Sequence, residues 1–336
     1  MINNAIDQLD KGQNLEATLM RQCVLEIMTG NVDQVTIQEF LSGLHHKGES
    51  IEEVVGAARA MREQMLPANF SQASLVDTCG TGGDGSMTFN ISTAAAIVAA
   101  AAGAKVAKHG NRKITSQSGS ADVLSELGVA ISCDVKVAQN CLDQAGVCFL
   151  FAPQFHPAMR HVAVARKNLP FPTIFNLLGP LLNPASVPHQ VLGIGKAEAW
   201  DLLVPALCKL SHGRCIVVRG QDGLGELTVL APTSVAIIQN GAQTTEIWNA
   251  SDFGLGGGKL SDLQVETPTQ SAALIHSLLA GANGTPRNMV IWNAAAAVWV
   301  SGVTNALPQA IKLCQDAIDS GQAATTLNTL VQVSNR

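Results

Sequence analysis

The sequence has few charged residues and no block of basic ones. Charged residues make up only 14% of the 336 residues, and the formal net charge is −5. The lack of a basic stretch argues against a nucleic-acid surface as the main purpose of the protein. Apolar residues make up 47%, so a large core can be buried, and the length is comfortable for two domains.

Long apolar runs are also missing. The longest aliphatic run, residues 94–102, has nine residues, whereas a membrane-spanning helix needs about 20. The N-terminal stretch MINNAIDQLDKGQNL is polar and lacks the apolar core of a signal peptide. We therefore expect a soluble protein of the cytoplasm that does not bind a membrane.

Patterns typical of structural metal sites are absent. The eight cysteines form no CxxC pair, and several lie in apolar segments such as GVCFLFAP, so we expect buried free thiols. His156 and His161 are five residues apart, which is poor helical geometry for a shared metal ligand. No zinc site is expected.

The first 66 residues are predicted to form helices. Apolar residues recur at helical spacing in LEATLMRQCVLEIMTG and TIQEFLSGLHHKG. Ser50 is followed three residues later by Glu53, the pattern of a capping box at a helix start. Pro67 closes this helical stretch.

From Leu75 onward, short apolar strands alternate with glycine loops and helices. The segment ISTAAAIVAAAAGA is apolar on every side and predicts a buried helix. SVAIIQNGAQTTEIW predicts a hairpin with its turn at Asn240 and Gly241. The other expected strands are LVDTC, KVAKHG, VCFLFAP, QVLGIG, RCIVVRG and LTVLAP. This alternation predicts an α/β domain with a mainly parallel sheet beside a small all-helical domain.

The stretch DTCGTGGDGSMTFN contains a glycine loop between a predicted strand and a predicted helix. Residues 80–85 match GxGxxG, but the region about 20 positions on reads KVAKHGNRK and lacks the acidic residue of a dinucleotide site. No Lys-Ser/Thr pair follows Gly85, so the loop is not a P-loop either. Asn90, Ser92 and Thr93 lie at the helix start, where free N–H groups attract anions. Ordinary helix capping after a tight turn is the alternative.

A second polar loop follows the next predicted strand. KHGNRKITSQSGSAD concentrates polar side chains: Lys108, His109, Asn111, Arg112, Lys113, Thr115, Ser116, Ser118 and Ser120. Successive parallel strands bring their following loops to one sheet edge, where ligands bind in such folds. A ligand with two phosphate centres would suit both loops, while Asp84 suggests a bound cation or a sugar hydroxyl.

Five segments together resemble the anthranilate phosphoribosyltransferase family. They are GTGGDGSMTFNIST, KHGNR…SGSAD, FAPQFHPAMRHV, TIFNLLGPLLNPA and DGLGE, and they occur in this order over nearly the whole chain. The resemblance implies a homodimer joined through the helical domain, with the active site in the hinge cleft. It implies a helical domain of residues 1–70 and about 165–187, and an α/β domain of residues 71–164 and 188–336.

The resemblance also implies a reaction of tryptophan biosynthesis. The amine of anthranilate would displace diphosphate from 5-phosphoribosyl 1-diphosphate with the help of Mg2+. The residues implied to bind 5-phosphoribosyl 1-diphosphate are Gly80, Gly83, Asp84, Thr88, Asn90, Ile91, Ser92, Thr93, Lys108, His109, Gly110, Asn111, Arg112, Thr115, Ser116 and Ser120. Those implied for anthranilate are Gly80, Asn111 and Arg166, and those implied for Mg2+ are Ser92 and Glu226. No residue is assigned as a general acid or base, because the amine is already a nucleophile.

Three features depart from the family's pattern. Gly225 stands where the family usually has an aspartate, so one carboxylate of the magnesium motif is missing. Asp222 is a possible substitute, and a plain Asp-Gly turn is the alternative. Pro170 and Pro172 remove two N–H donors close to the implied anthranilate site. Gln117 stands where lysine is usual.

Two other interpretations stay open from the sequence. One is a related phosphoribosyltransferase or a pyrimidine-nucleoside phosphorylase of the same fold, against which the complete GTGGDG, NIST and KHGNR set counts. The other is a degenerate family member that binds a phosphorylated ligand or nucleic acid without this activity. The departures at Gly225, Pro172 and Gln117 support that interpretation, and the intact phosphate loop counts against it.

Overall fold

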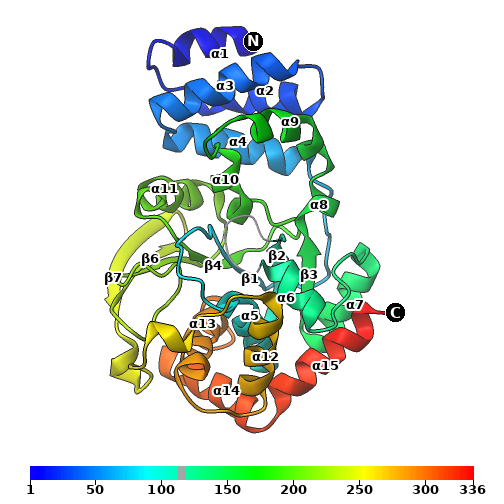
Figure 1. Ribbon diagram of the computed structural model, residues 1–336, viewed down its shortest axis with the longest axis vertical. Coiled ribbons are helices and arrows are strands. Elements are labelled where there is room, and N and C mark those ends of the chain that lie inside the picture. Colours follow the sequence, from blue (N-terminus) through cyan, green and yellow to red (C-terminus); the bar gives the residue numbers. More distant parts are fainter. Residues whose placement is uncertain (113–118) are drawn as a thin grey trace.

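The computed structural model describes residues 1–112 and 119–336, and a group of helices lies at one end of a layered sheet (Figure 1). Helices α1 to α4 form most of this helical group: Ile2–Leu9, Ala17–Met28, Gln34–Lys47 and Ile51–Gln64. The Asp33 side chain caps α3 by accepting from the Val35 and Thr36 N–H groups. Ser50 and Glu53 form the predicted capping box at the start of α4.

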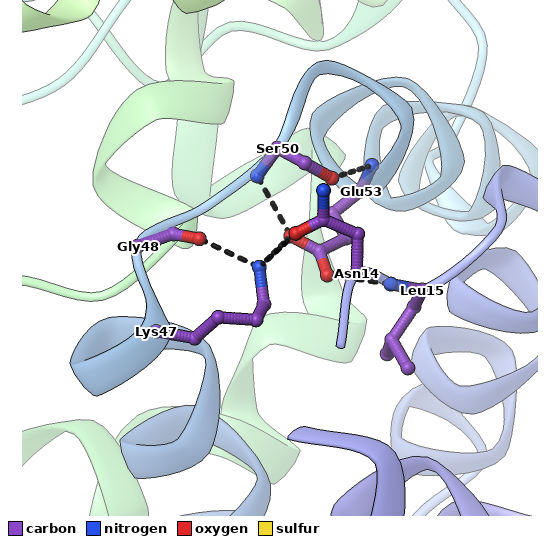
Figure 2. Close-up of polar contacts among 6 residues, drawn as sticks. All are labelled: Asn14, Leu15, Lys47, Gly48, Ser50 and Glu53. Carbon is purple, nitrogen blue, oxygen red and sulfur yellow. Dashed lines mark hydrogen bonds and ion pairs between the residues drawn. The ribbon is translucent and has the colours of Figure 1, made fainter. Parts of the chain in front are cut away.

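A buried ion pair ties the helical group together. The Glu53 side chain is fully buried, and its Oε2 lies 3.0 Å from Lys47 Nζ (Figure 2). Lys47 Nζ also donates to Asn14 Oδ1 at 2.9 Å and to the Gly48 carbonyl at 2.6 Å. Glu53 accepts further bonds from two backbone N–H groups, those of Leu15 at 2.8 Å and Ser50 at 2.7 Å. Every charged atom of the pair therefore has a partner.

The sheet has seven strands in the order β3-β2-β1-β4-β5-β6-β7. Neighbours from β3 to β5 are parallel, and β6 and β7 are antiparallel, which confirms the mainly parallel sheet. The strands are β1 Leu75–Gly80, β2 Lys105–Gly110, β3 Val147–Phe151, β4 His189–Gly193, β5 Cys215–Gly220, β6 Thr233–Gln239 and β7 Ala242–Trp248. Asn240 and Gly241 both have positive φ and form the predicted hairpin turn.

Helices cover both faces of the sheet. The remaining ones are α5 Ile91–Ala101, α6 Ser120–Glu126, α7 Val135–Ala145, α8 Ala152–Phe155, α9 Arg160–Asn168, α10 Phe175–Leu178, α11 Trp200–Leu210, α12 Pro268–Leu279, α13 Thr285–Val300, α14 Leu307–Asp319 and α15 Gln322–Ser334. Along β5, Ile216 and Val218 join a core with α5 and α13, whereas Val217 joins a second core with α11 and the helical group. The strand alternation thus separates two cores.

Helices α9 and α10 come from the middle of the chain and return to the helical group. Helix α9 contacts α2 and α3, and α10 contacts α4 (Figure 1). The crossing segments around them connect the helical group to the carboxyl edge of the sheet. The domain boundaries expected from the sequence stay a prediction.

One expected strand is wrong. The segment LTVLAP, residues 227–232, is irregular, and only its first half is fully buried. Side chains supply its backbone partners in place of a neighbouring strand: Asn293 Oδ1 accepts from Leu227 N, and Thr233 Oγ1 accepts from Thr228 N. Apolar composition alone therefore does not distinguish a strand from a buried connection. Among the described residues, no helix has the length and apolar character needed to cross a membrane.

Candidate active site

The two polar loops begin side by side at the carboxyl edge of the sheet. Strands β1 and β2 are parallel neighbours and end at Gly80 and Gly110. Helix α5 begins after the first loop, and its N-cap Asn90 accepts from Thr93 N at 3.1 Å. The remaining N–H groups of the first turn and the helix dipole make this end of α5 attractive to an anion.

Lys108 places a positive charge next to the start of α5. Its side chain comes from β2 and is buried, with only 2% of the residue exposed. Its Nζ donates to the Thr78 carbonyl and to Ser92 Oγ, the latter at 3.1 Å. Burial lowers the pKa of Lys108, and the negative charges of Asp77 and Glu226 oppose this shift. A negatively charged ligand at this position would favour the protonated amine in the same way.

Glu226 faces Lys108 from the segment that follows β5. Burial raises the pKa of the Glu226 carboxyl to about 8, Lys108 opposes the shift, and Asp84 adds to it. No described residue forms a hydrogen bond with this carboxylate, and no direct ion pair joins it to Lys108 within the described part of the chain. A half-buried carboxylate with no hydrogen-bond partner among the described residues suits a cation ligand, because an ion would offset its desolvation.

The oxygen donors fit Mg2+ in kind. The Glu226 carboxylate and the Ser92 hydroxyl, both close to Lys108, are hard ligands of the type that this ion takes while keeping several waters and substrate oxygens. Among the described residues, no group of three or more His, Cys, Asp and Glu side chains could enclose a metal. The arrangement therefore fits a metal that is held jointly by protein and substrate.

Glycines pack the first loop against two other chain segments. A Cβ on Gly193 would lie 1.8 Å from the Gly225 carbonyl oxygen, and one on Gly195 would lie 2.3 Å from the Gly82 carbonyl oxygen. Thr81 N donates to Gly193 O at 2.9 Å. Only residues without a side chain allow β1, β4 and the segment after β5 to approach so closely. We refer to Gly80, Gly82, Gly193, Gly195 and Gly225 as the glycine junction.

Asp84 connects the glycine loop to the segment that carries Glu226. Its Oδ1 accepts from Ser86 N at 3.0 Å and from Ser86 Oγ at 2.8 Å. Its Oδ2 accepts from Gly225 N at 3.2 Å, across 141 positions of sequence. The carboxylate is therefore occupied by the protein's own donors. Asp222 points elsewhere, because its carboxylate accepts from Leu224 N and from Thr228 Oγ1.

A buried polar network fixes the start of the second loop. Asp77 Oδ1 accepts from His109 N at 3.2 Å, and Asp77 Oδ2 accepts from Asn183 Nδ2 at 2.8 Å. The Nε2 atoms of His109 and His156 are 3.2 Å apart. Burial lowers the pKa of His109 to about 3 and that of His156 to about 4. Both rings are therefore neutral at pH 7, and they link β2 to the segment around α10.

Arg166 lies on α9, beside α10. Its guanidinium donates to Asn176 Oδ1 at 3.1 Å and lies 5.7 Å from the centre of the Phe175 ring. Asn176 Oδ1 also accepts from Thr173 N at 3.0 Å, so one amide holds both the arginine and the following loop. Phe171, which lies between Pro170 and Pro172, stacks on the ring of His45 in α3, with the ring centres 3.9 Å apart.

The other predicted site residues are spread around these groups. Thr88 forms a bridge with Gln264, Ile91 is the buried first residue of α5, and Ser120 is the first residue of α6. Asn111 and Arg112 are exposed at the second loop, and Gly83 lies in the first loop with φ of 78°. Thr93 Oγ1 is buried without a hydrogen-bond partner among the described residues. Thr115 and Ser116 lie outside the described residues, as do Lys113, Gln117 and Ser118.

Sequence reasoning missed several residues that shape the site. Ser271 of α12 is fully buried, and its Oγ accepts from Asn90 N at 2.9 Å. Gln264 Nε2 donates to the Ser86 carbonyl at 3.0 Å. Neither residue has a local signal, because both act over more than 170 positions. Gly193 and Gly195 do have a local signal, because a GxG at the end of a strand indicates a close backbone approach.

The chain matches a known family along nearly its whole length. A family described as "Glycosyl transferase family, a/b domain" matches residues 72–324, and its helical bundle domain matches residues 3–65. The anthranilate phosphoribosyltransferase of Moorella thermoacetica is 41% identical over 98% of each chain. That of a Thermoanaerobacter species is 42% identical over 100% of this chain and 99% of its own.

Solved structures agree with this assignment. The crystal structure of anthranilate phosphoribosyltransferase from Thermus thermophilus superposes with a TM-score of 0.90 at 36% identity, covering 99% of both chains. The enzyme from Saccharomyces cerevisiae in complex with PRPP and Mg has a TM-score of 0.89 at 28% identity, covering 99% of this chain and 98% of its own. The chain belongs to the anthranilate phosphoribosyltransferase family of glycosyl transferases.

Proposed function

We propose that this protein transfers the phosphoribosyl group of 5-phosphoribosyl 1-diphosphate to the amine of anthranilate, giving N-(5-phosphoribosyl)anthranilate and diphosphate in tryptophan biosynthesis. The observation that carries the proposal is the buried Lys108 at the N-terminus of α5, facing Glu226 across the edge of a parallel sheet. In the reaction, the bond from ribose C1 to the diphosphate oxygen breaks and a bond from C1 to the amine nitrogen forms. The surplus proton on nitrogen leaves to water.

The diphosphate is proposed to bind at the start of α5. The N–H groups of residues 91–93 and the Lys108 ammonium would stabilise the negative charge that develops on the leaving group. Ser92 and Glu226 are proposed to hold Mg2+, as the oxygen donors beside Lys108 suggest. The ion would neutralise the diphosphate charge as the C1–O bond breaks. A yeast relative solved in complex with PRPP and Mg supports this cofactor.

Anthranilate is proposed to bind between Arg166 and the first two loops. Arg166 is held by Asn176 and lies over Phe175, which leaves guanidinium N–H groups available for the carboxylate of the substrate. Gly80 and Asn111 would contact the same substrate from the sheet edge. Structures of the yeast relative in complex with 4-fluoroanthranilate support an aromatic acid as the second substrate.

Two further features belong to the proposal. The helical domain would comprise residues 1–70 and about 165–187, which the packing of α9 and α10 on α2, α3 and α4 supports. The protein would act as a homodimer joined through this domain. Sedimentation of the purified protein tests the dimer, and a monomer at micromolar concentration contradicts it.

The direct test follows the fluorescence of anthranilate on mixing protein, anthranilate, 5-phosphoribosyl 1-diphosphate and Mg2+. We expect a loss of fluorescence that requires all four components. No loss at any Mg2+ concentration would contradict the proposal. The same sample could also be mixed with a pyrimidine nucleoside and phosphate. Release of the free base in that mixture would instead favour a phosphorylase.

A further inference from the structure

Asp84 is unusual in a loop that is proposed to approach phosphates. A carboxylate there repels an anionic ligand, so its presence needs a reason. Among the described residues, its carboxylate accepts three hydrogen bonds, two from Ser86 and one from Gly225. Three donors converge on one side chain, and only a carboxylate can accept them all without bringing a donor of its own.

The bond to Gly225 acts on the residue directly before Glu226, and the neighbouring hydrogen bonds hold Leu224 and Leu227 on either side. Glu226 directly follows Gly225, and no described residue forms a hydrogen bond with the Glu226 carboxylate. The Gly225 backbone packs into the glycine junction, where its carbonyl oxygen occupies the space of a side chain at position 193. The direction of the Glu226 side chain therefore depends on how its own backbone is held.

We propose that Asp84 is a positioning residue for the metal ligand Glu226, which it orients through the Gly225 N–H. The inference rests on the proposed function, because Glu226 is assigned there as a magnesium ligand. It gives Asp84 a purpose that phosphate binding does not explain. Gly225 also suits the crowded junction, because a Cβ at this position would lie 3.1 Å from Gly195 N.

The test measures divalent cation binding in the absence of turnover. Mn2+ serves as the probe, and its binding in the presence of inorganic diphosphate is followed by electron paramagnetic resonance. Asp84→Asn replaces one acceptor oxygen by an N–H2 group and should weaken Mn2+ binding about tenfold, as loss of supporting hydrogen bonds around a metal ligand does. Asp222→Asn is the matched control, because its carboxylate lies three positions before Gly225 but contacts Leu224 and Thr228.

A double-mutant cycle decides whether Asp84 acts through Glu226. Glu226→Gln alone should weaken Mn2+ binding, and adding Asp84→Asn to it should cause no further loss. Additive losses, or unchanged affinity in Asp84→Asn, would overturn the positioning of Glu226. An equal loss in Asp222→Asn would do the same, because it would indicate a general disturbance of the loop. Melting curves of each variant confirm that the compared samples are folded.

The same assay separates this inference from the proposed function. If the unaltered protein binds Mn2+ with diphosphate and Asp84→Asn does so equally well, only the positioning by Asp84 fails. If the unaltered protein binds no Mn2+ with diphosphate, the metal site of the proposed function fails and the inference fails with it.

Discussion

Two lysine–glutamate arrangements in this protein, each with a buried lysine side chain, differ in how many of their polar atoms have hydrogen-bond partners. In the helical group, Glu53 accepts three hydrogen bonds and Lys47 donates three, so the pair is closed (Figure 2). At the sheet edge, Lys108 donates to Thr78 and Ser92, but Glu226 has no hydrogen-bond partner among the described residues. The two regions use the same residue types, but Glu53 is fully buried whereas Glu226 is half-buried.

This difference in hydrogen bonding distinguishes a pair that stabilises the fold from a pair that can bind a ligand. A closed pair has nothing left to offer a ligand, and removing one member leaves a buried charge alone. An open pair has already been desolvated and has a shifted pKa, which is the usual state of groups in ligand sites. The closed arrangement should therefore control folding, and the open one should control activity. Variants of each arrangement test this contrast.

The largest expected effect is on stability, from Glu53→Gln. The variant leaves the Lys47 ammonium buried without its counter-charge, so we expect the free energy of unfolding to fall by about 3–5 kcal/mol. Urea denaturation measures this fall. The activity of the protein that remains folded should be unchanged, since Glu53 lies in the helical group. Glu63→Gln removes an exposed partner of Arg21 and should leave stability unchanged, as for most surface pairs.

In the open pair, Glu226→Gln should reduce activity and leave stability intact, which is the opposite of the effect of Glu53→Gln. Loss of the carboxylate removes a proposed Mg2+ ligand, and kcat/KM should fall about 100-fold at a fixed Mg2+ concentration. The melting temperature should stay nearly the same, because the Glu226 side chain is half-buried and forms no hydrogen bond with a described residue. A loss of stability comparable to that of Glu53→Gln would show that Glu226 also has a structural function, and the contrast would fail.

Features that depend on contacts between residues close in the sequence could be predicted, and those that depend on contacts between distant residues could not. The capping box of Ser50 and Glu53, the strand before the glycine loop and the Asn240–Gly241 hairpin rest on local patterns and are confirmed. The contact of Asp84 with Gly225 spans 141 positions and has no local pattern, as only the fold brings the two loops together. The strand prediction for LTVLAP is wrong for the same reason, because the hydrogen bond of Leu227 N is accepted by Asn293 on the distant helix α13.

A third buried pair sharpens the comparison through pH. The pKa values of His109 and His156 are lowered to about 3 and about 4, from an ordinary value of 6.5. As pH falls from 6.5 toward 4, the unfolded chain binds protons at these residues and the folded chain does not, so stability should fall. Above pH 6.5 this contribution is fully present. Protonation of both rings would place two positive charges at the contact between their Nε2 atoms.

His156→Gln should reduce this acid sensitivity. The variant removes one of the two titrating groups, and the slope of stability against pH between 4 and 6.5 should decrease by about 1.4 kcal/mol per pH unit. Urea denaturation at pH 7, 6 and 5 gives the slopes, and His276→Gln, on an exposed helix position, is the matched control. Equal slopes in the unaltered protein and in His156→Gln would show that other groups dominate the acid response.

The smallest expected effect concerns backbone strain, which differs between the glycine loop of the candidate site and the hairpin turn between β6 and β7. Met87 lies in the glycine loop with φ of 57°, and Asn240 lies in the hairpin turn with φ of 52°. Asparagine tolerates this left-handed conformation better than methionine, so the hairpin is relaxed and the loop of the candidate site is strained.

Exchanging the residue types should therefore have opposite effects at the two positions. Met87→Asn should raise the free energy of unfolding by about 0.5–1 kcal/mol, and Asn240→Met should lower it by a similar amount. Urea denaturation measures both changes. No gain from Met87→Asn would mean that other contacts offset the strain, such as the hydrogen bond from Val265 N to the Met87 carbonyl at 2.9 Å. A gain accompanied by weaker diphosphate binding would mean that the strained loop is the form that fits the ligand.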